Sequence, residues 1–465
     1  FSMAIFLGLI YNRCIKSMYL TGGNTMYGLI ESLSELIRIP SISGDQEACD
    51  EALNYVLELG REFGLKTGKA AGGRVGFIEM GKGNETLGVL THVDVAHPGN
   101  IAKWEHNPFM PVLGGGKIYG RGVIDDKGPV ISALFAMKDV LEASRKHRVP
   151  MNKKIRLIVG TQQKIGAGDM REYLLENPAP TYSFTPDGNF EICNLQLGTL
   201  DLLLSFPLYD ENPQIVDIKA GSNIETIPDI CKIKLKDGRV FATKGMAGHA
   251  SEPALYANAI LEMARALSKL KRRAKAEMQE DLIYRVLQKL EQGFSDGTGF
   301  HLGIASMPNS QREKWGRNRV APTGIFCHKD RLYININCHY TADTTDAYLV
   351  RSISKFFKNE VVRIERVSTR HPSEASKGLP FIKELQEAYN NVLRKECGFG
   401  VNAPSTYAQI VPNTIVFGPS IIGKEDMRHR PGEYMHLKDL MLMQMIFGRA
   451  MANIVFKEKS FQLGG

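Results

Sequence analysis

The feature that most constrains the fold is a nearly uninterrupted apolar run, TLGVLTHVDV at residues 86–95. A strand that is apolar on both faces suits the centre of a sheet that helices cover on both sides. The run carries His92 and Asp94 near its end. Two interpretations are open at this point. The pair is either a metal-binding imidazole with its orienting carboxylate or two turn residues that satisfy loop amides.

Helical and strand patterns alternate around this run. Apolar residues at helical spacing mark 26–40, 47–65 and 130–146, while 75–81 and 153–164 have strand patterns. Such alternation predicts an α/β domain, in which ligands bind beyond the carboxyl ends of the strands.

The pattern changes after about Gly198, where antiparallel strands such as RLYININCHYTAD are predicted between helices, and the first pattern returns near residue 371. A chain of 465 residues also exceeds one ordinary hydrophobic core. We therefore predict an α/β fold with a discontinuous catalytic domain, residues 26–197 and 371–465, and an inserted α+β lid domain, residues 198–370. Residues 1–25 are interpreted as an N-terminal extension, because AIFLGLIY is shorter than the roughly 20 apolar residues of a membrane span and lacks the flanks of a signal peptide.

Charge and cysteine content indicate which partners and which cellular compartment to expect. The net charge of +8 is modest, and the densest basic run, KLKRRAK, falls on a predicted helix as a solvated face, so we expect neither a nucleic-acid nor a membrane partner. Seven widely spaced cysteines without a C-x-x-C pair indicate free thiols in a reducing compartment. We therefore expect a cytoplasmic protein.

Polar residues follow several predicted strands and should meet at one rim of the sheet. Histidine and aspartate are ligand types that zinc takes, and a carboxylate beside a ligating histidine is its usual support. A single H-x-D pair is a weak signal, but the ordered set is a much stronger one. The set comprises His92, Asp94, Asp125, Asp126, Gln163, Lys164, Asp187 and, from the returning segment, His429.

The motifs resemble those of a known family. The chain contains H-V-D-V-A, W-x-x-x-P-F, Y-G-R-G-x-x-D-D-K-G-P, T-P-D, G-H-A-S-x-P and P-N-T-x-x-F-G-P-S-x-x-G-K-E-D. From Met26 to about residue 457 it is similar to the co-catalytic zinc dipeptidases that include dipeptidase V, carnosinase and glutamate carboxypeptidase G, with dipeptidase V-like proteins as the nearest subgroup.

The resemblance implies a set of metal ligands. His92, Asp125 and Asp187 match the ligands of the first metal, with Asp125 bridging to a second metal. His429 matches a ligand of that second metal. The expected metal is zinc, with manganese as the alternative.

The resemblance also implies roles around the metals. Asp94 matches the residue that orients His92, and Asp126 follows Asp125 across a peptide bond that is cis in relatives. His249 matches a lid residue that donates to the tetrahedral oxyanion. The alternative for His249 is a histidine that only makes hydrogen bonds within its loop.

Two positions depart from the pattern. Active relatives carry two consecutive glutamates after G-T-x, the general base and a ligand of the second metal, where this chain has Gln163 and Lys164. A glutamine cannot accept a proton at neutral pH, and general-base assistance is worth roughly 10²- to 10⁴-fold in rate. A protonated lysine has no lone pair and cannot ligate a metal.

The change of charge at position 164, from glutamate in relatives to lysine here, suggests a different role for Lys164. Replacing glutamate by lysine adds two positive charges, as many as a divalent ion brings. Lys164 could therefore stand in for the second metal by bonding to Asp125. We predict at most one tightly bound ion, held by His92, Asp125 and Asp187.

Further departures concern substrate binding. Dipeptidase V-like relatives carry an arginine in the lid strand I-N-I-R-Y that clamps the substrate carboxylate, and here that position is Asn337. Relatives also read G-G-T-x-A-R before P-N-T, where this chain has Ser405 in the glycine-rich turn and Gln409 at the basic position. Neutral amides cannot replace the bidentate pair that arginine forms with a carboxylate.

Three functional hypotheses remain. The first is a dipeptidase-like protein that has lost ordinary hydrolysis and binds a small peptide or amino-acid derivative. The second is an active metallopeptidase or amidohydrolase with rearranged catalysis, in which Asp126, a metal-bound hydroxide or a carboxylated Lys164 restores function. The third is a non-catalytic partner-binding protein. We expect a monomer, with dimerisation through the lid as the alternative.

Overall fold

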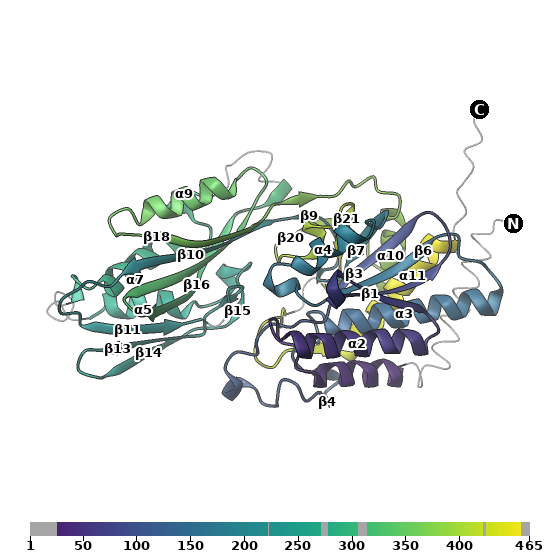
Figure 1. Ribbon diagram of the computed structural model, residues 1–465, viewed down its shortest axis with the longest axis horizontal. Helices are drawn as coiled ribbons and strands as arrows, with labels where there is room; N and C mark the ends of the chain where they lie inside the picture. Colours follow the sequence, from purple (N-terminus) through teal and green to yellow (C-terminus); the bar gives the residue numbers. More distant parts are fainter. Residues whose placement is uncertain (1–25, 222, 271–277, 306–313, 422–424, 457–465) are drawn as a thin grey trace.

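The computed structural model describes residues 26–221, 223–270, 278–305, 314–421 and 425–456. The predicted N-terminal extension, residues 1–25, lies outside this part of the chain, as does most of the basic run KLKRRAK. The described residues form two halves side by side, one around each of two large sheets (Figure 1).

The first half is built on a nine-stranded mixed sheet. Its order is β1 (Lys66–Ala70), β2 (Val75–Gly81), β6 (Lys154–Gly160), β3 (Thr86–His92), β7 (Tyr182–Thr185), β21 (Thr414–Phe417), β9 (Ile192–Gln196) and β19 (Ser373–Glu374), with β20 (Phe399–Asn402) also paired to β9. The central strands β6, β3, β7 and β21 run parallel. The apolar run therefore lies at the centre of the sheet, as its composition predicts.

Helices cover both faces of this sheet. Val89 of β3 packs into the main core, whereas the next residue, Leu90, packs into a separate cluster with Met170 and Tyr173. The main core includes residues of α2 (Gln46–Glu62), α3 (Lys127–His147), α10 (Ile382–Leu393) and α11 (Leu437–Phe456), and the second cluster includes α4 (Gly168–Glu176). Residues 26–38 are also helical. Helix α11 is long and apolar enough to span a membrane by composition, and 61% of its most apolar 18-residue stretch is buried inside the protein.

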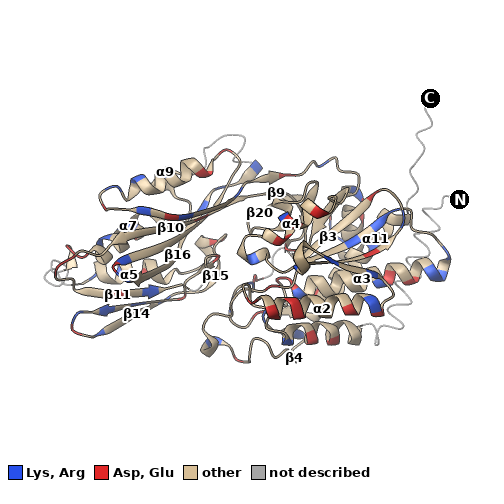
Figure 2. Ribbon diagram, viewed as in Figure 1, with Lys and Arg blue, Asp and Glu red and all other residues tan. Residues whose placement is uncertain are grey.

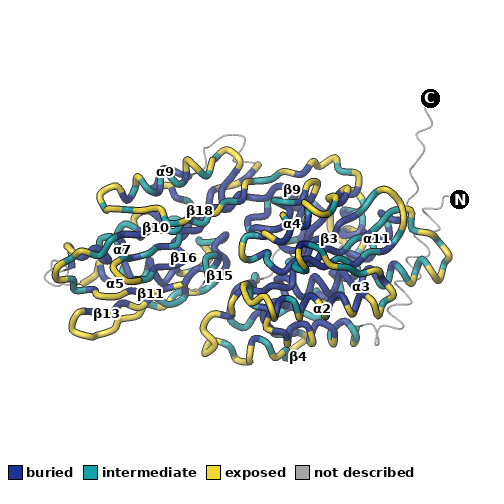
Figure 3. The backbone as a smooth tube through the Cα atoms, viewed as in Figure 1, coloured by how far each residue is buried: buried dark blue, intermediate teal, exposed yellow. Residues whose placement is uncertain are grey.

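The second half is built on a seven-stranded antiparallel sheet. Its order is β14 (Val240–Lys244), β13 (Ile230–Leu235), β11 (Ile215–Ala220), β16 (Arg319–His328), β17 (Arg331–Tyr340), β10 (Gly198–Pro207) and β18 (Arg363–Arg370). One face packs on α5 (Ala259–Ser268), α7 (Leu282–Phe294) and α9 (Asp346–Phe356), which share one core with it. Buried backbone runs through the middle of both sheets, while exposed residues gather in the outer loops and at the β13–β14 edge (Figure 3).

Small sheets and turns complete the described chain. The small sheets pair β12 (Thr226–Ile227) with β15 (Gly248–His249), β22 (Pro419–Ser420) with β8 (Gly188–Asn189), and β4 (Val112–Gly114) with β5 (Lys117–Tyr119) and β23 (Tyr434–His436). Short 3₁₀ turns are η1 (Ala71–Gly73), η2 (Ile101–Lys103), η3 (Gln163–Ile165), η4 (Pro253–Leu255), η5 (Phe300–Leu302) and η6 (Tyr407–Gln409).

One local expectation is wrong. The sequence placed Asp125 beyond a strand of the central sheet, but β5 belongs to a separate three-stranded sheet. Asp125 is positioned instead by the start of α3, which Asp126 precedes as the N-cap residue. The glycines at 114–116 close the β4–β5 hairpin, which keeps this segment away from the large sheet.

The boundaries of the predicted domains, 197/198 and 370/371, remain a prediction. The structure places Gly198 at the start of β10 and Arg370 at the end of β18, and these two strands pair with each other.

Candidate metal site

The position of His92 is set by the central strand that ends with it. Its Nδ1 lies 2.8 Å from the main-chain oxygen of Asp94 and 3.2 Å from the Asp94 carboxylate. A carbonyl oxygen only accepts hydrogen bonds, so Nδ1 must carry the proton. The lone pair of the neutral imidazole is therefore on Nε2, which is the arrangement that a metal-binding histidine needs.

Three buried atoms without hydrogen-bond partners face one another around Nε2. The Nε2 of His92 lies 3.2 Å from Oδ1 of Asp125 and 3.7 Å from Oδ2 of Asp187. Each of these three atoms lacks a hydrogen-bond partner among the described residues. Buried polar atoms are nearly always satisfied, so a converging unsatisfied set indicates a bound cation. One nitrogen and two carboxylate oxygens fit a zinc-type ion.

The Asp94 carboxylate organises the turn that follows β6. It accepts hydrogen bonds from the main-chain nitrogens of Gln163 at 3.1 Å and Lys164 at 3.0 Å, and from the Ser43 hydroxyl at 2.8 Å. Asp126 accepts from the main-chain nitrogen of His92 at 3.1 Å, and the Asp125–Asp126 peptide bond is cis. The Asp94 carboxylate thus holds Gln163 and Lys164 against β3, the strand that carries His92.

Lys164 occupies the other side of Asp125. Its Nζ lies 2.7 Å from Oδ2 of Asp125, and its side chain is only 6% exposed. Burial alone would lower the pKa of Lys164, but Asp125, Asp187 and Glu225 outweigh burial and raise it above its usual value. The structure therefore contains the ion pair that the charge arithmetic predicts, with Lys164 as an ammonium.

Gln163 lies beside the metal site but is turned toward a loop. Its Nε2 donates to the main-chain oxygen of Ser405 at 2.6 Å, while its Oε1 has no hydrogen-bond partner among the described residues. The hydroxyl of Ser405 is hydrogen-bonded to Thr199. The backbone of Ser405 is thus in contact with Gln163.

The other two predicted substrate-binding side chains have internal partners. Asn337 donates to Asp201 at 2.7 Å within the seven-stranded sheet, and Gln409 donates to the main-chain oxygen of Leu197 at 2.8 Å. The structure does not bring either residue into the group around His92.

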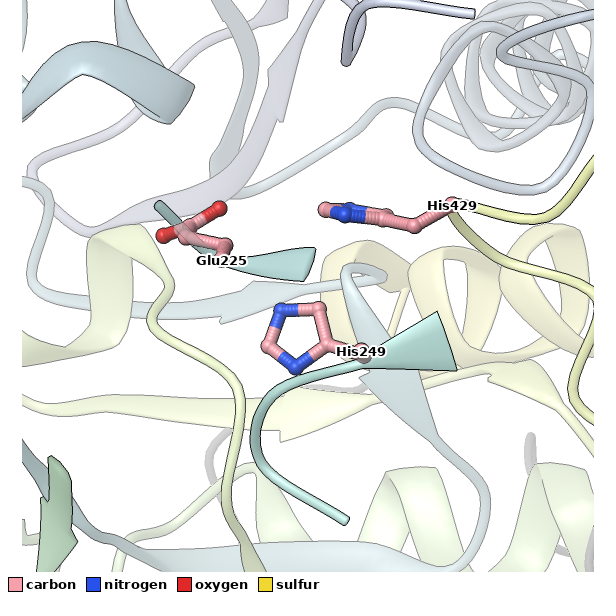
Figure 4. A group of neighbouring side chains, drawn as sticks. All are labelled: Glu225, His249 and His429. Atoms are coloured by element: carbon pink, nitrogen blue, oxygen red, sulfur yellow. The ribbon is translucent and has the colours of Figure 1, made fainter. Parts of the chain in front are cut away.

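A second buried group lies beside the first. Glu225, His249 and His429 present ligand-type atoms that all lie within 4.8 Å of one another. Figure 4 shows the side chains of Glu225, His249 and His429 pointing toward one space, with His249 on β15, Glu225 just before β12 and His429 on the C-terminal segment. His429 has φ 61°, a left-handed conformation that is uncommon outside glycine and is typical of functional positions. Its Nε2 lies 3.1 Å from Oδ2 of Asp125, which joins the two groups.

His249 is arranged as a neutral donor. The main-chain nitrogen of Ser251 donates to its Nδ1 at 3.1 Å, so the proton of the neutral ring is on Nε2. Burial first, and then the neighbouring His429 and His339, lower the pKa of His249 well below its usual value. The ring is therefore uncharged at neutral pH, and its Nε2–H is free to donate to a ligand oxygen.

Glu225 is the site residue that sequence reasoning missed. It is 3% exposed, and burial raises its pKa to about 7 despite the opposing effect of Lys164 and Arg370. The segment GSNIETIPD around it reads as an ordinary loop. Only the packing of the antiparallel half against the first half brings Glu225 to His429.

The pKa of His92 predicts how metal binding depends on pH. Burial would lower this pKa, but the carboxylates of Asp125, Asp187 and Asp94 around the ring outweigh burial and raise it well above its usual value. The metal-free protein then carries a proton on Nε2 that a metal must displace. We expect zinc binding to release about one proton, and its affinity to rise about tenfold per pH unit below that pKa. Calorimetry in buffers of different ionisation enthalpy measures the release, and binding without proton release would contradict this prediction.

The sequence model of peptidase family M20/M25/M40 matches residues 88–453. "Putative dipeptidase YtjP" of Bacillus subtilis (strain 168) is 26% identical, and the alignment covers 91% of this chain and 96% of that protein.

Solved structures share the fold. Human carnosine dipeptidase 1 superposes with a TM-score of 0.63 at 14% identity, covering 97% of this chain and 98% of that one. A dinuclear metal-binding peptidase of the M20 family from Bacillus subtilis superposes with a TM-score of 0.52 at 12% identity, covering 93% and 99%. These likenesses extend over both halves of the chain, so the α/β fold with its second, antiparallel half is confirmed.

Proposed function

This chain belongs to peptidase family M20/M25/M40, and from that premise we propose that it is a dipeptidase-like metallohydrolase homologue that has lost ordinary dipeptide hydrolysis. It binds one metal ion together with a small peptide or amino-acid derivative. The observation that carries the proposal is the 2.7 Å ion pair between Lys164 and Asp125. The ammonium occupies the coordinating oxygen of Asp125 that a second metal would need.

The chemistry of the donor set supports one ion. His92, Asp125 and Asp187 would hold it, and a zinc-type ion there would polarise a bound amide carbonyl and acidify a water. Zinc is the proposed metal, with manganese as the alternative. The 2+ charge of the ion and the ammonium of Lys164 would together face Asp125, Asp187 and Glu225, the three carboxyl groups that act on Lys164.

The other residues bind and orient a ligand without supplying a base. The Nε2–H of neutral His249 is a donor for a ligand carbonyl oxygen. Gln163 stands where a base is needed, but an amide cannot take the proton of a water. A cavity of about 370 Å³ opens beside His429 between the two halves, within the size range of small-molecule sites. We also propose a monomeric, cytoplasmic protein, and the six described cysteines are all free.

Glu225 favours a second candidate, a hydrolase with one metal and a rearranged base. Its carboxyl group has a pKa of about 7 and lies next to His249 and His429, which suits a general base near neutral pH. A carboxylated Lys164 is less favoured, because carbamate formation requires a neutral amine and the ion pair with Asp125 raises the pKa of Lys164.

The test combines metal counting with a hydrolysis assay on the full chain. We expect one tightly bound zinc ion per chain, binding of dipeptides, and turnover roughly 10²- to 10⁴-fold below an ordinary enzymatic rate, which is the value of general-base assistance. Two ions per chain or ordinary turnover would contradict the proposal. Ordinary turnover with one ion that disappears in Glu225→Gln would establish the second candidate instead.

A further inference from the structure

A second set of metal-ligand side chains lies beside the tight site and holds no part of the proposed ion. Glu225, His249 and His429 have ligand-type atoms within 4.8 Å of one another, and the residues are only 3%, 4% and 5% exposed (Figure 4). Two imidazoles and one carboxylate form the donor set of a common class of zinc site. This set differs from the second-metal site that the family resemblance implies, because it leaves out Asp125 and position 164.

His249 can present a lone pair to this group. Its Nδ1 lies 2.7 Å from the hydroxyl of Ser251, which can accept a hydrogen bond when Nδ1 carries the proton. The lone pair is then on Nε2, on the side of the ring away from Ser251. A ligating histidine whose other nitrogen donates to a neighbouring oxygen is the usual arrangement at metal sites. His249 therefore becomes a metal ligand by exchanging one neutral tautomer for the other.

An ion in this group must displace contacts that already exist. Lys164 and Arg370 act on the charge of Glu225, and Nη2 of Arg370 lies 3.5 Å from Oε1 of Glu225. The change of tautomer takes from the main-chain nitrogen of Ser251 the acceptor that it has at 3.1 Å. The three ligand atoms of the tight site, by contrast, have no hydrogen-bond partner among the described residues. The second group should therefore bind the same metal much more weakly than the first.

An ion in this group would also change how the ligand binds. The proposed donor to a ligand carbonyl oxygen is the Nε2–H of His249, and a ring that ligates a metal through Nε2 has no proton there. His429, a second member of the group, lines the cavity of about 370 Å³ in which the ligand is proposed to lie. The weak ion and the ligand therefore compete for the same ring and the same space.

We propose that Glu225, His249 and His429 bind a second, low-affinity zinc ion that opposes binding of the peptide ligand. This inference rests on the proposed function and deepens it by adding a regulation of the same site. The tight ion stays bound at all times, and the weak ion enters only when zinc is in excess. Because two ligands that oppose each other do so reciprocally, a bound peptide also lowers the affinity for the weak ion.

Zinc titration of the full chain by calorimetry tests the site. The native protein is expected to bind one ion tightly and a second ion at least about 100-fold more weakly, a difference of about 2.7 kcal/mol. In Glu225→Gln the weak ion should be lost, because a neutral amide replaces the carboxylate ligand. The tight ion should remain in this variant, which shows that the site has kept its fold.

Binding of L-alanyl-L-alanine at zinc concentrations below and above the filling of the weak site gives the functional readout, corrected for the zinc that the free peptide binds. In the native protein the affinity for the peptide should fall about 3- to 10-fold once the weak ion is bound, the value of one neutral hydrogen bond. In Glu225→Gln the affinity should not change with zinc.

The matched control is Glu252→Gln. Glu252 pairs with Arg319 as Glu225 pairs with Arg370, it lies three residues after His249, and its side chain is 43% exposed. Its removal takes away an equal charge and should keep both zinc ions and the effect on the peptide.

Three results would overturn the weak site and leave the proposed function standing. They are a native protein that binds only one ion in excess zinc, a weak ion that persists in Glu225→Gln and is therefore adventitious zinc elsewhere, and a peptide affinity that does not fall when the weak site fills. Two ions of similar, tight affinity would contradict both this site and the proposed function. Failure to bind the peptide at low zinc would contradict the proposed function itself.

Discussion

The double substitution Gln163→Glu/Lys164→Glu is expected to give a protein that binds two zinc ions and hydrolyses dipeptides at least about 100-fold faster than the native chain. Gln163→Glu supplies a proton acceptor beside the metal site, a change worth roughly 10²- to 10⁴-fold in rate. Lys164→Glu removes the ammonium from Asp125 and supplies a carboxylate ligand in its place. The measurements are zinc content per chain and turnover of a dipeptide with added zinc.

The metal-free form of this variant should be less stable than the native chain. The substitution removes one positive charge and adds two negative charges in a buried region that contains Asp125, Asp187 and Glu225, so uncompensated carboxylates repel one another until metal binds. Zinc should therefore raise the melting temperature of the variant more than that of the native protein. Gln162→Glu is the matched control, because it adds a carboxylate one residue away on a partly exposed side chain. A double variant with neither a second ion nor increased turnover would show that the rest of the site, and not these two positions, prevents hydrolysis.

Local chemistry explains which features could be predicted from the sequence. The apolar run ending at His92 demands a central strand, and observed β3 is buried on both faces of the sheet. The Lys164–Asp125 ion pair could be anticipated for a different reason. The resemblance to the dipeptidases places position 164 beside Asp125, the change of charge at position 164 favours an ion pair, and that pair is present.

The features that could not be predicted depend on pairing between distant segments. Strand β18, RIERVSTR, is an edge strand with mostly exposed and charged residues, so it lacks the alternation that marks a strand with one buried face. Arg370, at its end, becomes a buried residue only through its pairing with β10. Glu225 joins His429 from about 200 positions away in the chain for the same reason. In the first half, Asp125 was assigned to the wrong sheet because a three-residue hairpin strand has the same local pattern as a central strand.

Asp125→Ala is expected to produce the largest loss of stability in the site, about 3–5 kcal/mol in the free energy of unfolding of the metal-free protein at pH 7, together with loss of metal binding. Asp125 is the partner of Lys164 at 2.7 Å, of His429 at 3.1 Å and of His92 at 3.2 Å. Removing it leaves a buried ammonium without its main counter-charge. Denaturant unfolding measures the stability, and zinc titration measures the metal affinity.

The pKa of Asp125 determines the pH at which the stabilities of the native protein and Asp125→Ala should be compared. Burial would raise its pKa, but Lys164, His429 and His92 outweigh burial and hold it well below its usual value. A carboxyl group with a lowered folded pKa stabilises the protein above its unfolded pKa near 4, and that stabilisation is lost as the pH falls further. At pH 7 the contribution is fully present, so the difference between native and variant should shrink in acid, where Asp125 is protonated, and in strong alkali, where Lys164 loses its proton.

Asp187→Ala separates the role of Asp125 as a metal ligand from its role as the ion-pair partner of Lys164. Asp187 is a proposed ligand of the same metal, but its Oδ2 has no hydrogen-bond partner among the described residues and Lys164 pairs with Asp125 instead. Its removal should weaken zinc binding at least about 100-fold, beyond the range of losses at supporting residues. The metal-free protein should lose less stability than in Asp125→Ala, because Asp187 lies 3.7 Å from His92, Lys164 keeps its ion pair with Asp125, and repulsion among carboxylates is relieved. Equal destabilisation by both variants would mean that the ion pair does not hold the site together, and the interpretation of Lys164 as a substitute for a second metal would then fail.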